Sequence, residues 1–468
     1  MCSRHEDIHN FVMENWEAVV ADIAKLVSIE STEDLSSRTS NSPWGPGPRK
    51  ALDAALLVAE RLGLEPHDCN GMIGYADVPG DVAGQIATIA HLDVVPAGPG
   101  WTTNPFSLVR RDGCLVGRGV LDDKGPAVLT LWVAHFLRKK SSVPRRSVRI
   151  MLGVNEETGM GDARWYVKHY KAPDFLFTPD AVWPVVCGEK GSYNAELSWS
   201  PAPDGRIVEI SGGTARNAIA ANAYAVVRAD YARLSPAADI ELSSCGSKLV
   251  RIEAHGTGGH AAEPDGKTSA IGLLIDYILD NGIYSNPEKM WLDFESLVYS
   301  STDGSAFGIK ADDDVFSPLT VISGTMKTDG GKFVQSIDCR YPKSVNADWI
   351  AEGIERTCKN FGIGFAEVHR GMPLFVSPDS DEVQMLMHCY SEWFDRNAHP
   401  VTLGGGTYAK RFPKAVAFGP AEFDPVLPSW AGGIHGPNEA VSEQLMQRSL
   451  CTYIDALDRL SSMKVMDA

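Results

Sequence analysis

Paired cysteines are what this 468-residue sequence most clearly lacks. Its nine cysteines are scattered along the chain, and no two of them form a Cys-x-x-Cys pair. An odd number of widely separated thiols argues against a disulfide framework and against a structural zinc site. We therefore expect reduced cysteines and a cytoplasmic location, because thiols stay reduced in that compartment.

Long apolar runs are also missing, and none approaches the length of about 20 residues that crosses a bilayer. Residues 1–27 have the apolar spacing of an amphipathic helix rich in acids, which differs from the pattern of a signal peptide. Positive charge is scarce as well, since the net charge is −17. This excess of acids argues against a nucleic-acid or an anionic-membrane partner.

The order of predicted elements indicates two domains, as does the length of the chain. In residues 1–189 short apolar strands alternate with helical patterns, which is typical of a mixed, largely parallel sheet covered by helices. The next part alternates polar and apolar residues, as antiparallel strands do, with a helix expected over 218–231. We therefore predict a discontinuous α/β domain, 1–189 and 377–468, interrupted by an inserted α+β domain, 190–376.

Residues that can bind metal ions follow several of the predicted strands. His91 and Asp93 stand where an apolar strand should end, and their side chains leave it on the same side. A similar place, at a strand end or in a loop, is held by Asp122, Glu156, Glu157, Asp180 and His435. Imidazole and carboxylate groups in this number suit two divalent metal ions that share a bridging carboxylate and a water molecule. The sequence therefore predicts a dinuclear metal site.

A series of short motifs spans nearly the whole chain. In order they are WGPGPRKALDAAL, AHLDVVPAG, NPFSL, GRGVLDDKGP, NEETG, TPDAVWPVVCGEKG, GTGGHAAEPDGKTSA, FGIK, IDCRYPK, GGGTYAK and GGIHGPNE. This set resembles the co-catalytic zinc peptidases of the carboxypeptidase G, aminoacylase and carnosinase superfamily, and within it the bacterial PepV dipeptidase branch. The resemblance implies a zinc-peptidase catalytic domain, an inserted lid domain, and hydrolysis of dipeptides or short peptides.

The same resemblance implies a role for each candidate ligand. The ligands would be His91 and Asp180 for one ion, Glu157 and His435 for the other, and Asp122 for both. The ions would be two divalent metals per chain, zinc or alternatively manganese or cobalt, because such ligands accept several divalent ions. In the relatives the peptide bond after the bridging residue is cis, so we expect a cis bond between Asp122 and Asp123.

The resemblance also implies which residues act in catalysis. Glu156 would be the general base, taking a proton from the metal-bridging water and returning it to the leaving amine. Asp93 would hold the second ring nitrogen of His91 and so determine its tautomer. His260, in the glycine-rich motif of the inserted domain, would stabilise the oxyanion of the tetrahedral intermediate.

Substrate contacts are implied at three further places. Arg340 would pair with the substrate carboxylate, because a guanidinium group fits a carboxylate with two parallel hydrogen bonds. Backbone N–H groups for a carboxylate end would come from Gly405, Gly406 and Thr407. Asn217 resembles a substrate-contacting asparagine of the lid, although the Val-Pro that follows it in the family is Ile-Ala here.

Three functions are compared on this basis. The leading prediction is a metallodipeptidase acting on a small peptide, with a self-contained active site in a monomer. An N-acyl-amino-acid amidohydrolase is the alternative, but such relatives often have Glu where this chain has Asp180, and their lid is shorter than the insertion 190–376. A catalytically inactive peptide-binding protein would lack a metal ligand or the base, and the sequence has all of them.

Overall fold

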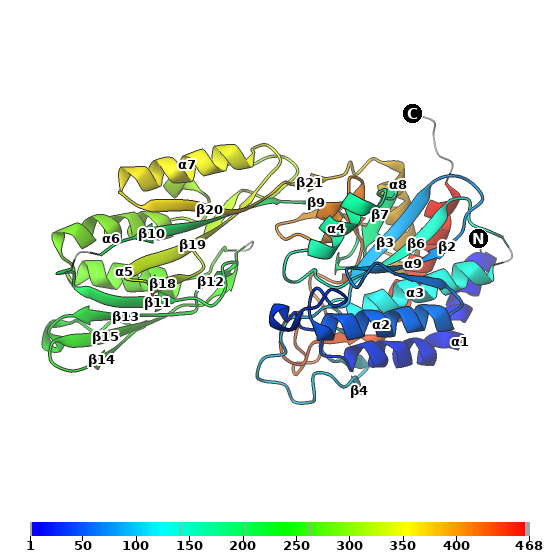
Figure 1. Ribbon diagram of the computed structural model, residues 1–468, viewed down its shortest axis with the longest axis horizontal. Helices are drawn as coiled ribbons and strands as arrows, with labels where there is room; N and C mark the ends of the chain where they lie inside the picture. The colour runs from blue at the N-terminus through cyan, green and yellow to red at the C-terminus, as the bar shows by residue number, and fades with distance from the viewer. Residues whose placement is uncertain (1, 141, 202, 262–263, 464–468) are drawn as a thin grey trace. The chain divides into compact units, whose positions relative to one another are not determined.

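The structure, a computed structural model, describes residues 2–140, 142–201, 203–261 and 264–463. The chain divides into two compact units, which are coloured by residue number in Figure 1. Unit 1 comprises Met1–Gly188, Val376–Val401 and Gly406–Ala468, and unit 2 comprises Glu189–Phe375 and Thr402–Gly405. Unit 1 is therefore discontinuous in sequence, and nearly all of unit 2 is one insertion into it.

Unit 1 is built on a mixed sheet whose middle strands are parallel. In spatial order these are β6 (Ser147–Gly153), β3 (Gln85–His91), β7 (Phe175–Thr178) and β23 (Ala415–Ala417). β2 (Gly74–Val78) and β1 (Glu65–Asp68) extend it as antiparallel strands beyond β6, and β9 (Val186–Glu189) is antiparallel to β23. The middle strands are almost entirely buried, as strands of parallel sheets usually are. The predicted mixed sheet is confirmed, with parallel pairing in its middle and antiparallel pairing on both sides of it.

Helices bury this sheet (Figure 1). α3 (Lys124–Lys139) and α9 (Glu443–Ser462) lie side by side against β3 and β6, and α1 (Cys2–Val27) packs on both helices. The other helices of unit 1 are α2 (Pro46–Arg61), α4 (Gly161–His169) and α8 (Asp381–Phe394). In the part of the chain that the structure describes, no helix combines the length and the apolar character needed to cross a membrane.

Short strands complete unit 1. β25 (Ala440–Ser442), β5 (Cys114–Val116) and β4 (Val109–Arg111) form a small antiparallel sheet, and β24 (Pro420–Ala421) pairs with β8 (Ala181–Val182). Two more short strands, β21 (Leu374–Phe375) and β22 (Val401–Leu403), occur where the chain passes from one unit to the other.

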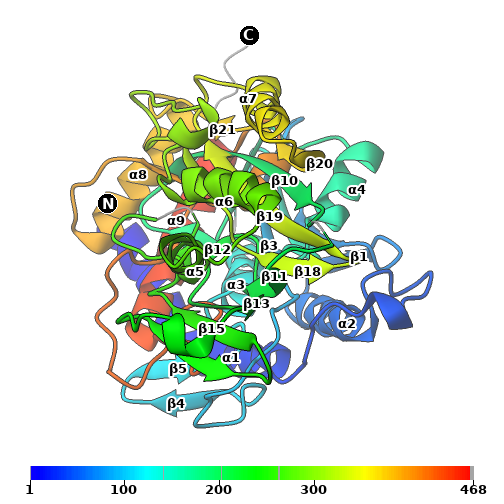
Figure 2. The same ribbon diagram turned by 90° about the vertical axis from the view of Figure 1, so that its left-hand side faces the viewer.

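Unit 2 is built on an antiparallel sheet. In spatial order its strands are β14 (Ile240–Ser244), β15 (Leu249–His255), β13 (Asn222–Arg228), β11 (Ile207–Gly212), β18 (Met326–Asp329), β19 (Lys332–Tyr341), β10 (Gly191–Trp199) and β20 (Gly364–Gly371), with β17 (Thr320–Ile322) paired to β19. Figure 2 shows the helices that lie along this sheet, α5 (Ala270–Asp280), α6 (Asn286–Tyr299) and α7 (Ala347–Asn360). Apolar residues of sheet and helices form one continuous core, as an α+β domain requires.

One predicted element of unit 2 is wrong. The helix expected over 218–231 is replaced by two strands, β12 (Ala218–Ile219), which pairs with β16 (Gly259–His260), and β13. Along β13 the buried residues alternate with more exposed ones, which is the period of a strand that covers a core on one face. The several alanines of this stretch imitate a helical pattern, and pairing with β11 and β15 overrides that local preference.

A polar chain crosses the core of unit 2. The Gln335 side chain donates to Glu295 at 3.0 Å, and Ser323 donates to Gln335 at 3.2 Å. The Tyr299 hydroxyl in turn donates to Ser323 at 2.9 Å. Burial raises the pKa of Glu295 to about 8, and the hydrogen bond from Gln335 offsets only part of that rise. Burial therefore favours the protonated, neutral form of Glu295 near pH 7.

Glu295→Gln is expected to remove a pH dependence of folding stability. Between pH 4.5 and about 8 the unfolded chain releases the proton of this carboxyl group while the folded protein keeps it, so stability falls as pH rises. The slope is at most about 1.4 kcal/mol per pH unit. Urea unfolding at pH 5.5 and pH 7.5 should therefore show the variant gaining stability relative to wild type at the higher pH.

The control for this experiment is an exposed glutamate of α7. Glu352→Gln should leave the pH dependence of the wild-type protein unchanged. If the stability difference between wild type and Glu295→Gln is equal at both pH values, the carboxyl group is not held in its neutral form by burial.

Candidate metal centre

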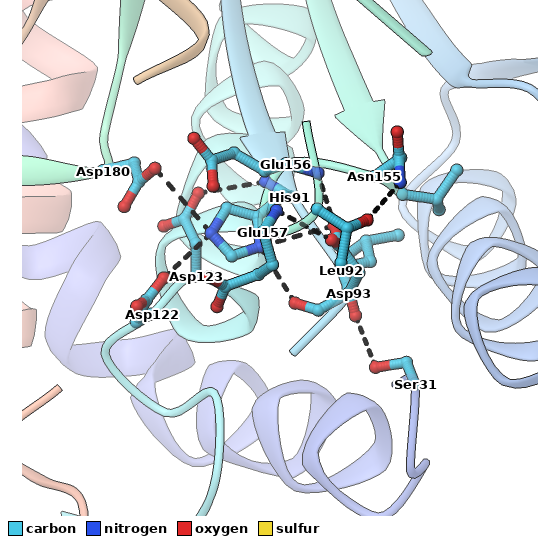
Figure 3. Close-up of polar contacts among 12 residues, drawn as sticks. Ser31, His91, Leu92, Asp93, Asp122, Asp123, Asn155, Glu156, Glu157 and Asp180 are labelled. Carbon is cyan, nitrogen blue, oxygen red and sulfur yellow. Dashed lines mark hydrogen bonds and ion pairs between the residues drawn. The ribbon is translucent and has the colours of Figure 1, made fainter. Parts of the chain in front are cut away.

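Seven predicted site residues, all in unit 1, come together where the parallel strands end; Figure 3 labels all of them except His435. β3 ends at His91, the segment after β6 carries Glu156 and Glu157, and Asp180 follows β7. Parallel neighbouring strands have their carboxyl ends at one edge of a sheet, so residues that follow these strands in the sequence lie close together in space. Asp93, Asp122 and His435 reach the same place from loops.

His91, Asp122 and Asp180 form the first group of potential ligands. The His91 Nε2 atom lies 2.8 Å from Asp122 Oδ1 and 3.7 Å from Asp180 Oδ2. In Figure 3 both carboxylates approach the same side of the His91 ring. One imidazole and two carboxylates therefore present their donor atoms to a single point.

Asp122 also belongs to a second group, with Glu157 and His435. The His435 Nε2 atom lies 3.0 Å from Asp122 Oδ2 and 3.2 Å from Glu157 Oε2. Asp122 thus directs one carboxylate oxygen into each group, which is the arrangement of a bridging ligand.

The backbone next to Asp122 has the conformation that the sequence comparison predicted. The peptide bond between Asp122 and Asp123 is cis. The Asp123 carboxylate accepts the backbone N–H of His91 at 3.0 Å. Asp123 had no predicted role. In the structure it binds the last residue of β3 through the backbone N–H of the candidate ligand His91.

The tautomer of His91 is determined by the backbone of Asp93. The His91 Nδ1 atom lies 2.9 Å from the carbonyl oxygen of Asp93 and 3.6 Å from the nearer carboxylate oxygen. A carbonyl oxygen only accepts, so Nδ1 donates and Nε2 is left for a ligand. The carboxylate of Asp93 instead accepts the N–H groups of Glu156 and Glu157, each at 3.1 Å.

The site concentrates negative charge in a buried space. Burial, reinforced by the charge of Asp180, raises the pKa of Glu156 well above its usual range. Hydrogen bonds to Asp122 and Glu157 raise the pKa of His435 to about 10. Burial opposes the charged form of His91, but the hydrogen bond to Asp122 and the nearby carboxylates outweigh it and raise the pKa of His91 as well. Each imidazole is thus in surroundings that attract positive charge.

These donors fit two divalent metal ions. Imidazole nitrogens and carboxylate oxygens are the ligands of catalytic zinc sites and of related divalent metals. Glu157 Oε1 is a buried oxygen with no hydrogen-bond partner among the described residues, as expected of an atom reserved for a ligand. The two groups of donors share Asp122, so a pair of ions would be bridged.

A buried glutamate that had no predicted role supports the loop before Asp122. Glu439 accepts the backbone N–H groups of Gly119, Leu121 and Asp122 at 3.1, 3.0 and 3.2 Å. Its charge is matched by Arg118, whose Nη1 atom lies 2.6 Å away. Arg118 therefore neutralises this carboxylate, and its Nη2 atom also donates to the backbone carbonyl of His435 at 3.1 Å. Glu439 is the last residue of the GGIHGPNE motif, which was the available signal in the sequence.

The predicted substrate-binding residues of unit 2 lie on its strands and turns. Arg340 in β19 pairs with Asp338 through Nε and Nη2, at 2.6 and 2.9 Å. Asn217 is exposed, and its backbone carbonyl oxygen accepts the backbone N–H of Ala261 at 2.9 Å. His260 pairs with Ala218 through the backbone of β16, and its side chain lies outside the described part of the structure.

The remaining predicted contacts lie in one glycine-rich turn. Gly405 belongs to unit 2, whereas Gly406 and Thr407 belong to unit 1. The Thr407 hydroxyl accepts the N–H of Ala409 at 3.1 Å and so begins a 3-10 turn over Tyr408–Arg411.

Comparisons with known proteins cover most of the chain. A model of the family described as peptidase family M20/M25/M40 matches residues 87–459. The Beta-Ala-Xaa dipeptidase of Lactobacillus delbrueckii subsp. lactis is 30% identical over 471 aligned residues, covering 95% of this chain and 96% of that protein. A putative dipeptidase of Staphylococcus haemolyticus is 27% identical over 461 residues, covering 94% and 96% of the two chains.

Solved structures share the fold. Human carnosine dipeptidase 1 superposes with a TM-score of 0.62 at 14% identity, covering 98% of this chain and 99% of the other. The di-peptidase Dug1p from Saccharomyces cerevisiae superposes with a TM-score of 0.61 at 13% identity, with the same coverage. At such low identity the likeness supports the fold alone.

Proposed function

Because the chain belongs to the peptidase family M20/M25/M40, we propose that it is a metal-dependent dipeptidase whose catalytic centre is the site around Asp122. The observation that carries the proposal is the single carboxylate of Asp122, with one oxygen in each of two groups of ligands. Such a bridge is what a pair of co-catalytic ions requires.

The residues of this site divide the chemistry among them. His91, Asp122, Glu157, Asp180 and His435 hold two divalent ions. Such ions would supply Lewis-acid polarisation of the peptide carbonyl group and would lower the pKa of a bound water molecule. Zinc is the proposed metal, with manganese and cobalt as alternatives, because imidazole and carboxylate donors accept all three.

Glu156 is the proposed general base. It takes a proton from the attacking water as the oxygen bonds to the carbonyl carbon, and it delivers that proton to the nitrogen as the peptide bond breaks. Glu156 follows β6 directly beside the proposed ligand Glu157 and is absent from both groups of potential ligands, so its carboxyl group is left to accept and return a proton. His260 is the proposed donor to the oxyanion.

Arg340 is the proposed partner of the substrate carboxylate. Its side-on pairing with Asp338 uses Nε and Nη2, so the edge formed by Nη1 and Nη2 is the one that can receive a second carboxylate end-on. Further contacts are proposed for Asn217, Gly405, Gly406 and Thr407.

The experiment that tests this function compares two substrate panels. Purified protein reconstituted with zinc, manganese or cobalt is assayed with dipeptides, including peptides with an N-terminal β-alanine, and with N-acetyl amino acids. Higher kcat/KM for dipeptides supports the proposal. Higher kcat/KM for the N-acetyl amino acids would assign the chain to amidohydrolases instead, and no hydrolysis of either panel would contradict the proposed function.

We further propose that one chain suffices for activity. His260 and Arg340 both belong to unit 2, whose insertion is long enough to supply them without a second subunit. Activity per chain should therefore stay constant on dilution, and a mixture of His260→Ala and Glu156→Gln protein should remain as inactive as the separate variants. Recovered activity in the mixture would show that residues are shared between subunits.

A cytoplasmic location is also proposed. The cysteines whose side chains the structure describes are free thiols, and most of them are buried. Free buried thiols are typical of proteins from reducing compartments.

A further inference from the structure

Four consecutive backbone N–H groups, those of residues 154–157, are all bound by buried carboxylates. Val154 and Asn155 donate to Asp162 Oδ2 at 2.6 and 3.0 Å. The next two donate to Asp93, one to each oxygen. Asp162 is fully buried, so these bonds are shielded from water and hold the segment firmly.

In this segment the adjacent residues Glu156 and Glu157 both reach the candidate metal centre, which an extended backbone would not allow. Successive residues of an extended chain point in opposite directions, yet both Glu156 and Glu157 lie at the candidate metal centre. The backbone therefore leaves the extended conformation after β6, turns over residues 156–159, and reaches a left-handed conformation at Met160, with φ of 59°. The two carboxylates bind the N–H groups on the approach to this turn.

Tyr408 completes the surroundings of Asp162 from a distant part of the sequence. It is fully buried, and its hydroxyl donates to Asp162 Oδ2, the oxygen that also accepts Val154 and Asn155. The contact requires a glycine at the end of β6, because a Cβ atom on Gly153 would lie 2.1 Å from the Tyr408 hydroxyl oxygen. The hydroxyl is therefore packed directly against the start of the segment that carries Glu156 and Glu157.

We propose that Asp162 and Tyr408 are positioning residues for the general base and for one metal ligand. Together they hold Val154 and Asn155, the residues that lead into the turn, so that Glu157 reaches the second metal position and Glu156 reaches the attacking water. The first metal position is formed by His91 at the end of β3 and by Asp180 after β7. The Tyr408 ring also packs edge-on against His91, with 6.4 Å between ring centroids, but removal of the hydroxyl alone keeps that ring contact. The inference rests on the proposed function for Glu156, but its effect on Glu157 is measurable without catalysis.

Tyr408→Phe is the decisive variant, since it removes one hydroxyl and keeps the ring. Zinc titration of the metal-free protein, followed with a competing chromogenic chelator, should show one of two binding steps weakened about 10–100-fold, as is usual for groups that support a ligand. The other step should be unchanged. With a dipeptide, kcat should fall by a similar factor while KM stays within about twofold, because substrate contacts are intact.

The same substitution in His435→Ala protein shows which metal-binding step is weakened. His435→Ala protein should keep only the position of His91 and Asp180, so adding Tyr408→Phe there should not change the affinity of the remaining ion. Tyr166→Phe is the matched control: it removes the hydroxyl of another buried tyrosine, bonded to Arg149 at 2.7 Å, and should leave both binding steps unchanged. Asp162→Asn should reproduce the effect of Tyr408→Phe or exceed it.

Two results would overturn the inference. Unchanged binding steps and kcat in Tyr408→Phe would show that the hydroxyl serves packing alone, and equal weakening of both steps would show a general loosening of the site. If wild-type protein binds two ions but hydrolyses no dipeptide, the proposed function fails, while the titrations still decide whether Asp162 and Tyr408 position Glu157.

Discussion

Glu156→Gln protein is expected to bind two metal ions per chain and to hydrolyse dipeptides at least about 10²–10⁴-fold more slowly than wild type. The amide has nearly the shape of the carboxylate but cannot accept the proton of the attacking water. Glu156 is absent from both groups of potential ligands, so metal binding should persist. The measurements are kcat with a dipeptide and metal content by elemental analysis.

The matched control is the neighbouring residue. Glu157→Gln weakens a ligand, so this variant should lose one of the two ions as well as activity. If Glu156→Gln protein loses metal, or keeps near-normal kcat, Glu156 does not act as the base. If the two variants behave alike, the division of roles between the adjacent glutamates is wrong.

Asp122→Ala is expected to lose both metal ions, whereas His435→Ala should lose one. The reason is geometric, because Asp122 contributes an oxygen to each group of ligands and His435 contributes to a single group. The loss of affinity should exceed the 10–100-fold typical of residues that only support a ligand. Equilibrium dialysis against buffered zinc gives the number of ions per chain directly.

Activity should vanish in both variants, so metal content is the quantity that separates them. His91→Ala provides the reciprocal control, since it should leave the ion held by Glu157 and His435. One ion retained in Asp122→Ala would show that the carboxylate does not bridge. Two ions retained in His435→Ala would place the second ligand elsewhere.

Much of the candidate centre was predictable because its residues follow strands. Apolar runs ending at His91, before Glu156 and before Asp180 indicate strands by themselves, and parallel pairing brings such ends to one edge. The cis bond after Asp122 was also predicted, from the resemblance of the GRGVLDDKGP motif, and it is confirmed. Each apolar run and the GRGVLDDKGP motif is a local pattern, made by residues close together in the sequence.

The local pattern failed where strand and helix share a composition. The alanines of residues 218–231 suit a helix as well as a strand, and only pairing of β13 with β11 and β15 decides between them. The contacts of Asp93 also needed the structure. Its backbone carbonyl oxygen accepts from the His91 ring, whereas its carboxylate accepts the backbone N–H groups of Glu156 and Glu157.

By itself, then, the sequence determined the class of fold and the residue types that could hold two metal ions. Only the tertiary structure decided that Glu439 holds the loop of Asp122, and that Tyr408 and Asp162 hold the segment of Glu156. The physical reason is that a buried carboxylate gains its partners from whichever backbone N–H groups the fold brings within 3.2 Å or less. Those partners are hundreds of residues away for Glu439 and Tyr408, and no local pattern encodes them.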